Sequence, residues 1–421
     1  MNKTMILGPK DRPATAKWII LSFQHVFAMF GATILVPMLT GLSVGVALVT
    51  SGIGTLIYIA LTRAKVPMYL GSSFAYIGAV VAAFEMSGSF NSAFVGITVV
   101  GLIYIVVAFI IKFTGTNWLT KLLPPVVIGP MIMIIGLGLA PVAIGNIGLD
   151  GNGFDWKIIL VAVVTFLTTT LLAIRGKGFL KVIPFIIAVA VGYLLSLALG
   201  IVDFTAFEGV KFFQLPDFSF IGTYKLDFTA LGIFVPLAFV TLSEHVGDHI
   251  VLSEIMGTDL INDPGLEKTI MGDGVATLVA GLMGGPANTS YGENTSVVGL
   301  TKVASVWVTG LAAIIAIALG FLGYIQAFIT SIPWAVIGGM TVVLYGFIAG
   351  NGVRVLIKDQ TDLGNPRNLI VVSTMLVIGL GGATLNLGTN VSISGMALAA
   401  IVGILLNLFL PHEKKEPIIS E

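Results

Sequence analysis

Long apolar runs recur along the whole chain, and they constrain its fold more than any other feature. A helix needs about 20 mostly apolar residues to cross a lipid bilayer. The mean hydropathy is +1.03, and only 10% of the residues are charged, against about 25% in a soluble domain. The chain is therefore predicted to be an all-α polytopic membrane protein. The apolar runs are 19–39, 43–62, 91–111, 124–145, 157–174, 182–202, 229–250, 303–323, 333–350, 367–382 and 393–410.

Three more segments are apolar but interrupted by Gly, Pro or polar residues, namely 67–86, 268–284 and 285–301. Counting them gives about fourteen crossings. With the N-terminus inside, every Lys and Arg except Lys157, Lys211 and Lys225 falls on the cytoplasmic side, as the positive-inside rule requires. The uncharged loops 324–332 and 383–392 fall outside. We therefore expect a multi-pass protein of the cell membrane with both termini in the cytoplasm.

The longest polar stretch, 203–228, divides the chain into two halves of seven segments. An odd number of segments per half predicts an inverted repeat, which is a recurrent transporter plan. Residues 22–26 resemble 242–246, and at the same offset residues 71–74 fall beside 291–294. The second match lies in the third segment of each half, and both of these segments are interrupted. Paired interrupted segments indicate a binding site at the membrane midplane.

Acidic residues within predicted spans are costly, at about 2.5–3.5 kcal/mol each at the bilayer centre. Glu244, Asp248, Asp273 and Glu293 all fall in such spans. Glu244 and Asp248 are four residues apart, so they share one helix face. They favour a substrate cavity lined by Glu244, with Asp248 as a proton or hydrogen-bond site. The alternative is a polar cluster that joins helices. His245 and His249 form a second pair on another face, for which helix packing is as good an interpretation as ligand contact.

The stretch 284–294 cannot be an ordinary lipid-facing helix, because Pro286 and its glycines loosen the backbone. Irregular backbone at this depth survives only inside protein or along a water-filled cavity. Its free N–H groups and a following half-helix N-terminus can bind the acceptor oxygens of a ligand. The stretch 67–76 is its counterpart, in which Phe74 offers a backbone N–H and an aromatic face. The alternatives are a surface loop for the first stretch and a core or lipid-facing role for Phe74.

Several classes of function are excluded by what the sequence lacks. There is no cysteine and there are only four histidines, so disulfides, thiolate sites and a His-rich metal centre are not expected. The 21 basic and 21 acidic residues balance, which gives no reason to expect a nucleic-acid partner. No nucleotide-binding loop and no nucleophile–base pair is present. We expect a transporter without cofactors, not an enzyme, and one driven by an ion gradient.

At these motifs the chain resembles the nucleobase–ascorbate transporter family, and within it the uracil-transporting bacterial members. The resemblance spans nearly the full length. The stretch 293–302 follows the family signature, with Glu293 at its start, Lys302 at its end and Ser296 where Gly is usual. The other motifs are Gln24-His25, Gly71-Ser72-Ser73-Phe74-Ala75, Glu244-His245-Val246-Gly247-Asp248, Tyr291-Gly292-Glu293-Asn294 and Leu344-Tyr345-Gly346.

The resemblance implies fourteen transmembrane segments in a 7+7 inverted repeat, with short antiparallel strands in segments 3 and 10. It implies a core formed by 1–112 (segments 1–4) and 229–323 (segments 8–11). A gate is formed by 113–228 (segments 5–7) and 324–421 (segments 12–14), and a homodimer forms through the gate helices. The implied substrate-binding residues are Glu244, Glu293, Phe74, Gly292, Tyr291, Tyr345 and Ser73. The implied proton-coupling residues are Glu244, Asp248, His245 and Glu293, and the implied supporting residues are Gln24, His25, Asn294 and Thr301.

Proton-coupled uptake of uracil is the function that this resemblance implies. The chemistry of the residues agrees, because uracil has two N–H donors for two carboxylates and two carbonyl oxygens for two backbone N–H groups. A site that pairs such groups strongly rejects analogues that lack them. The alternatives are a xanthine or urate permease of the same family and, less favoured, a channel or anion transporter on the same architecture.

Overall fold

The computed structural model of this chain describes residues 5–151, 153–181, 183–386 and 392–411. Within these ranges, seven helices are long and apolar enough to cross a membrane, as judged by length and composition. They are α1 (Thr15–Thr40), α2 (Val44–Leu61), α4 (Asn91–Thr114), α6 with α7 (Pro125–Gly138 and Ala140–Asn146), α8 (Trp156–Arg175), α10 (Leu231–Met256) and α15 (Trp334–Lys358). Shorter apolar helices are α9 (Pro184–Ala198), α13 (Val306–Gly320), α16 (Pro366–Leu380) and α17 (Gly395–Phe409).

One segment expected to be interrupted is a continuous helix. Residues 268–284 fall almost wholly within α11 (Leu266–Leu282). Its glycines permit close packing on α4, because a Cβ atom added at Gly274 would lie 2.7 Å from the Cβ atom of Tyr104, and one at Gly281 would lie 2.7 Å from the backbone nitrogen of Thr98. Small residues at helix contacts let backbones approach closely in membrane proteins. The glycines of this segment are thus packing residues and do not break the helix.

Several short elements occur where only loops were expected. The uncharged stretch 324–332 largely forms helix α14 (Gly323–Thr330). The uncharged stretch 383–392 contributes to a two-stranded pair, β3 (Thr384–Asn386) with β4 (Ser392–Ser394). The remaining short elements are α5 (Asn117–Leu122), η2 (Gly178–Lys181), η3 (Thr205–Phe207) and η4 (Ile261–Gly265). Residues 1–4 and 412–421, which carry part of the expected inward positive charge, lie outside the described ranges.

Two short buried strands pair with each other in the interior of the molecule. Strand β1 (Leu70–Ser72) pairs antiparallel with β2 (Asn288–Ser290), and Gly71 lies opposite Thr289. Each strand leads into a helix: β1 into η1 (Phe74–Tyr76) and α3 (Ile77–Ser87), and β2 into α12 (Gly292–Thr301). All residues of both strands are buried. Mutual pairing satisfies backbone groups that lipid could not satisfy.

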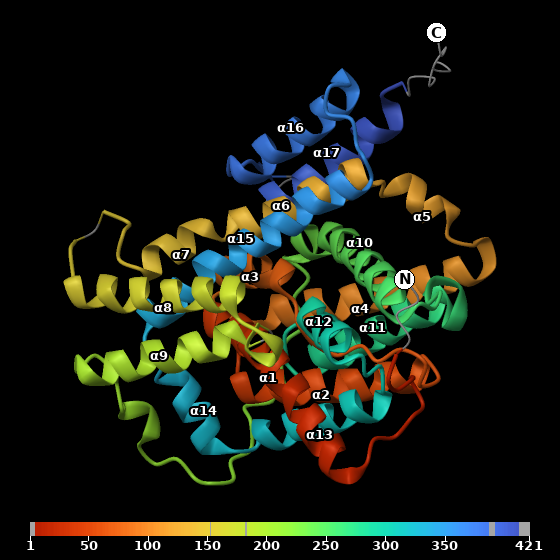
Figure 1. Cartoon of the computed structure of the whole chain (residues 1–421). Coiled ribbons are helices and arrows are strands. Elements are labelled where there is room, and N and C mark those ends of the chain that lie inside the picture. The colour runs from red at the N-terminus through yellow and green to blue at the C-terminus, as the bar shows by residue number, and fades with distance from the viewer. Residues whose placement is uncertain (1–4, 152, 182, 387–391, 412–421) are drawn as a thin grey trace.

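The helices pack in two groups that alternate along the chain (Figure 1). In the first group, α4 packs on α10 and α11, α2 on α11 and α13, and α1 on α13. In the second group, α15 packs on α6 and α8, α8 on α9, and α16 on α6 and α17. Helices α6 and α15, far apart in sequence, therefore run side by side. The groups meet mainly where α10 contacts α17 and α6, and where α1 contacts α9.

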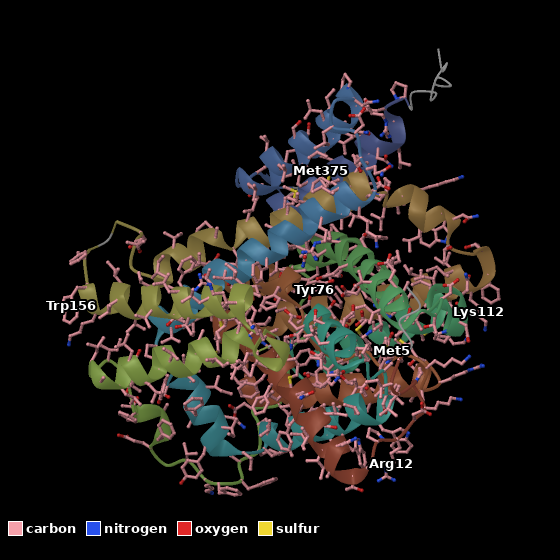
Figure 2. The ribbon with its side chains drawn as sticks, in the orientation of Figure 1. Met5, Arg12, Tyr76, Lys112, Trp156 and Met375 are labelled. Atoms are coloured by element: carbon pink, nitrogen blue, oxygen red, sulfur yellow. The ribbon has the colours of Figure 1, made fainter. Side chains whose placement is uncertain are left out.

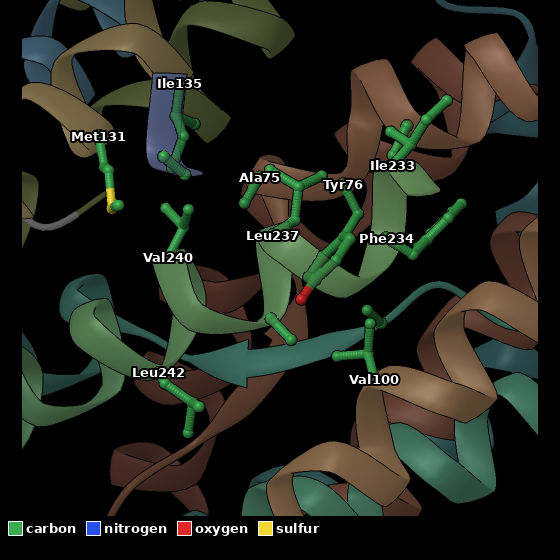
Figure 3. Close-up of a cluster of buried hydrophobic side chains, with 14 of the residues drawn as sticks. Ala75, Tyr76, Val100, Met131, Ile135, Ile233, Phe234, Leu237, Val240 and Leu242 are labelled. Carbon is green, nitrogen blue, oxygen red and sulfur yellow. The ribbon is translucent and has the colours of Figure 1, made fainter. Parts of the chain in front are cut away.

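An apolar cluster fills the junction between the two groups. It joins Leu237 and Val240 of α10 to Met131 and Ile135 of α6, all buried. Figure 3 shows these side chains facing one another, with Tyr76 beside them. The ring of Tyr76 stacks on Phe234, with centroids 5.8 Å apart. Apolar contact of this kind is non-directional, so it holds the groups together without fixing one relative position.

Charged and interior side chains separate clearly within the described ranges. Figure 2 shows Arg12 and Lys112 at the periphery of the molecule and Tyr76 in its interior. The guanidinium group of Arg12 lies 4.4 Å from the ring centroid of Trp18, which is a cation–π contact. The interior acidic residues are therefore exceptional in this chain.

Candidate functional site

Two helix N-termini begin where the paired strands end. Glu293 lies in the first turn of α12, directly after Gly292. Phe74 begins η1, which continues into α3. Gly292 is exposed and Phe74 is half-buried. A helix N-terminus presents free N–H groups and a positive dipole end, so both ends can hold acceptor oxygens.

Asp248 lies against the junction of β2 and α12. The hydroxyl group of Ser290 donates a 2.8 Å hydrogen bond to Asp248 Oδ2. A Cβ atom added at Gly292 would lie 4.0 Å from Asp248 Oδ1. Helix α10 thus brings this carboxyl group directly to the unwound backbone of the second half. Ser290 was not among the predicted site residues, although it lies within the interrupted stretch that signalled the site.

Three carboxyl groups converge at this junction. Glu244 lies one turn before Asp248 on α10, and its carboxyl group is close enough to those of Asp248 and Glu293 to interact electrostatically with both. Asp248 and Glu293 interact in the same way. In the described ranges no Lys or Arg forms an ion pair with any of the three. Like charges at short range repel strongly away from water, so this cluster suits protons and N–H donors as its counterparts.

Glu293 also faces a narrow pocket between the two helix groups. Phe27 and Gly31 of α1, Phe185 of α9 and Leu344 of α15 line its other sides. The pocket has about 10 Å³ of free volume, which is room for about one water molecule. A planar heterocycle can enter only if α1 and α12 separate from α9 and α15.

Two predicted site residues carry buried hydroxyl groups without a partner. Ser73 is 1% exposed and Tyr345 is 2% exposed, and neither hydroxyl group forms a hydrogen bond in the described structure. Leaving a buried polar group unpaired costs about 1–3 kcal/mol. Both hydroxyl groups therefore keep hydrogen-bonding capacity that the described structure does not use.

The hydroxyl group of Tyr291 already has hydrogen-bond partners within the protein. It donates a 2.9 Å hydrogen bond to the Ser72 carbonyl oxygen and accepts one from Thr33. A Cβ atom added at Gly71 would lie 2.4 Å from the Tyr291 ring. The structure thus places Tyr291 as a brace across the strand pair, with its hydroxyl group directed at β1.

The predicted supporting residues fall in two places. Asn294 Nδ2 donates to the His25 carbonyl oxygen at 3.1 Å and contacts His25 Nδ1 at 3.0 Å, which ties α12 to α1. Gln24 has a buried Oε1 atom without a partner. Thr301 lies at the far end of α12, where its hydroxyl group donates to the Val297 carbonyl oxygen, so the structure does not bring it to the carboxyl cluster.

His245, which was predicted to couple protons, pairs with a fourth buried acid, Asp273. Asp273 is itself close enough to Glu244 and Asp248 to interact electrostatically with both. The His245 side chain is 0% exposed, and its Nδ1 atom lies 2.8 Å from Asp273 Oδ2. Its neighbour one turn on, His249, contacts the Tyr58 hydroxyl group. Sequence reasoning flagged Asp273 as a buried acid but did not find these partners, because they come from helices distant in sequence.

Comparison with known proteins places the chain in a family. A model described as the Permease family matches residues 16–388. The uracil permease of Bacillus caldolyticus is 50% identical over 418 residues, which cover 98% of this chain and 96% of that protein. The uracil permease of Bacillus subtilis (strain 168) is 48% identical, with 98% and 97% covered.

Solved structures share the fold at low sequence identity. The transmembrane domain of a cyanobacterium bicarbonate transporter BicA has a TM-score of 0.62 at 14% identity and covers 95% of this chain and 99% of its own. The murine Solute Carrier 26 family member A9 anion transporter in the inward-facing state has a TM-score of 0.70 at 10% identity, with 95% and 69% covered. These likenesses show an all-α membrane fold. Because the family model covers most of the chain and both permeases align over nearly its full length, this chain belongs to the Permease family.

Proposed function

We propose that this chain imports uracil across the cell membrane by proton symport. The observation that carries the proposal is the meeting of Glu244, Asp248 and Glu293 at the N-terminus of α12, without a basic partner in the described ranges. Uracil offers two N–H donors to such carboxyl groups. The near full-length likeness to the two uracil permeases supports the same substrate.

In the proposed site, Glu244 and Glu293 accept the N–H groups of uracil. The backbone N–H groups of Phe74 and Gly292 serve its carbonyl oxygens, and the unpaired hydroxyl group of Tyr345 meets the ligand. Glu244, Asp248 and Glu293 exchange the coupled proton with the two sides of the membrane. Ser73 adds a free hydroxyl group, while Tyr291, Gln24, His25 and Asn294 support the site. No cofactor takes part.

Transport would proceed by rocking of a core against a gate. The core is 1–112 with 229–323, and the gate is 113–228 with 324–421. The alternation of the two helix groups along the chain and the apolar junction between them support this division. We further propose fourteen crossings in a 7+7 inverted repeat, both termini in the cytoplasm and a homodimer through the gate. The antiparallel pairing of β1 with β2, one strand from each half, supports such a repeat.

Proteoliposomes test this function directly. Labelled uracil should accumulate under an inward proton gradient and leave when the gradient collapses. Glu293→Ala should abolish uptake, because it removes an acceptor from the pocket wall, whereas a folded Ile250→Ala variant, altered at an exposed position of α10, should retain it. Wild-type binding by Glu293→Ala would refute its assigned role. Stronger competition by xanthine or urate than by uracil would favour the purine alternative.

A further inference from the structure

Helix α10 carries a buried polar stripe beside Glu244 and Asp248. Thr241, His245 and His249 recur every four residues, so they share one face. Their exposures are 1%, 0% and 0%. Glu244 lies about 100° and Asp248 about 60° around the helix from His245, so both carboxyl groups lie beside the stripe. The stripe and the carboxyl groups therefore keep a constant angular relation.

Each stripe residue bonds to a different neighbouring element. The Thr241 hydroxyl group donates to the Leu237 carbonyl oxygen at 3.1 Å, so its lone pairs remain for the hydroxyl groups of Tyr76, at 2.8 Å, and Tyr104. These two tyrosines belong to η1 and α4. All hydrogen-bonding capacity of Thr241 is then used.

The two histidines anchor the following turns. His245 Nδ1 meets Asp273 of α11 at 2.8 Å. His249 Nδ1 lies 2.6 Å from the His245 carbonyl oxygen; because a carbonyl oxygen only accepts, this nitrogen carries the proton. His249 Nε2 therefore accepts from the Tyr58 hydroxyl group of α2. Successive turns of α10 are thus fixed to η1 and α4, then α11, then α2.

Apolar packing alone does not specify how α10 is rotated. Apolar side chains occur all round this helix, with no distinct apolar face, so its apolar pattern does not mark one face as the one to be buried. The His245–Asp273 pair also leaves His245 Nε2 and Asp273 Oδ1 buried without partners. A well-packed apolar pair is often as stable as a buried charged one, so stability alone does not account for this pair.

Building on the proposed function, we propose that Thr241, His245 and His249 are positioning residues that set the rotation of α10 and so aim Glu244 and Asp248 at α12. A rotation by one residue would break all three anchors at once and turn both carboxyl groups from the β2–α12 junction. In this assignment His245 holds the helix and carries no coupled proton.

A cross-linking experiment tests the positioning without any substrate. The chain has no cysteine, so Asp248→Cys with Ser290→Cys gives one reactive pair at residues that are hydrogen-bonded in the native protein. A short bifunctional thiol reagent should join them rapidly. Adding His245→Leu with Asp273→Leu should slow the joining about tenfold or more while the protein stays folded, and Ile250→Ala should not slow it. An unchanged rate in the double leucine variant would overturn the proposal.

Uracil binding by variants with the native Asp248 and Ser290 separates positioning from stability and from proton coupling. The double leucine variant should melt near the wild-type temperature but bind uracil about tenfold or more weakly. His245→Asn keeps a donor near the Nδ1 position. It should therefore retain rapid cross-linking when combined with the cysteine pair, and proton-driven accumulation when Asp248 and Ser290 are native. Loss of accumulation by His245→Asn with intact cross-linking would assign the proton to His245 and refute the proposal. Failure of the wild type to bind uracil would reject the proposed function alone, because the cross-linking result stands without it.

Discussion

Tyr345 of α15 shows how one residue can trade stability for binding. Its hydroxyl group is buried at 2% exposure without a partner. We expect Tyr345→Phe to raise the unfolding free energy of the ligand-free protein by about 1 kcal/mol, because an orphaned polar group is removed. Uracil affinity should fall about tenfold, because a hydrogen bond to the ligand is lost. Thermal unfolding and a binding titration measure the two effects; a gain in stability with unchanged affinity would show that this hydroxyl group does not meet the ligand.

The acidic residues of the site could be predicted from the sequence, but most of their hydrogen-bond partners could not. Glu244, Asp248 and Glu293 stood out because a carboxyl group within a membrane span demands a reason. The donor to Asp248 is Ser290, and serines are too common in apolar segments to signal such a role. The pairing of His245 with Asp273 depends on the rotation of α10, for which its apolar pattern contains no signal.

At the scale of elements, glycines within apolar segments play two structural roles, as breaks in a helix and as sites of close helix packing. The sequence alone could not distinguish these roles. In 67–86 and 285–301 the breaks correspond to strands β1 and β2, whereas in α11 the glycines admit α4. Only the neighbouring helix distinguishes the two cases. The long runs were found because bilayer thickness sets their length. Short α14 and the β3–β4 pair were missed because elements of three to eight residues leave little periodicity.

The strand pair requires a residue without a side chain at position 71, because the Tyr291 ring packs directly against Gly71. A Cβ atom there would come within 2.4 Å of the Tyr291 ring, and this residue braces β1 through the Ser72 carbonyl oxygen. Gly71→Ala should therefore destabilise the protein by about 1–3 kcal/mol and weaken uracil binding. Gly78→Ala is the matched control, because nothing lies within 4 Å of its added Cβ atom. Melting curves of both variants check this; equal stabilities would mean that Tyr291 moves aside without cost.

At the scale of the whole molecule, apolar clusters join the two helix groups, and one ion pair in the described part of the chain also spans them. The apolar cluster around Leu237, Val240, Met131 and Ile135 permits sliding. At another point, Lys358 at the end of α15 forms a 2.6 Å ion pair with Glu254 of α10. Any motion that separates these helix ends must break this pair. An exposed pair is worth only about 0–1 kcal/mol, so it can bias the closed arrangement without locking it.

Charge reversal at this pair should change how often the pocket opens. Ala28 lines the pocket, and in a chain without cysteine Ala28→Cys reports pocket opening through its rate of reaction with a thiol reagent. Glu254→Lys or Lys358→Glu should raise that rate by up to about fivefold, which corresponds to about 1 kcal/mol. The double reversal should restore the slow rate, because opposite charges face each other again. High salt should lessen these differences, since screening acts on exposed charges. If the double reversal reacts as fast as either single variant, the ion pair does not hold the two groups together, and closure rests on the apolar junction alone.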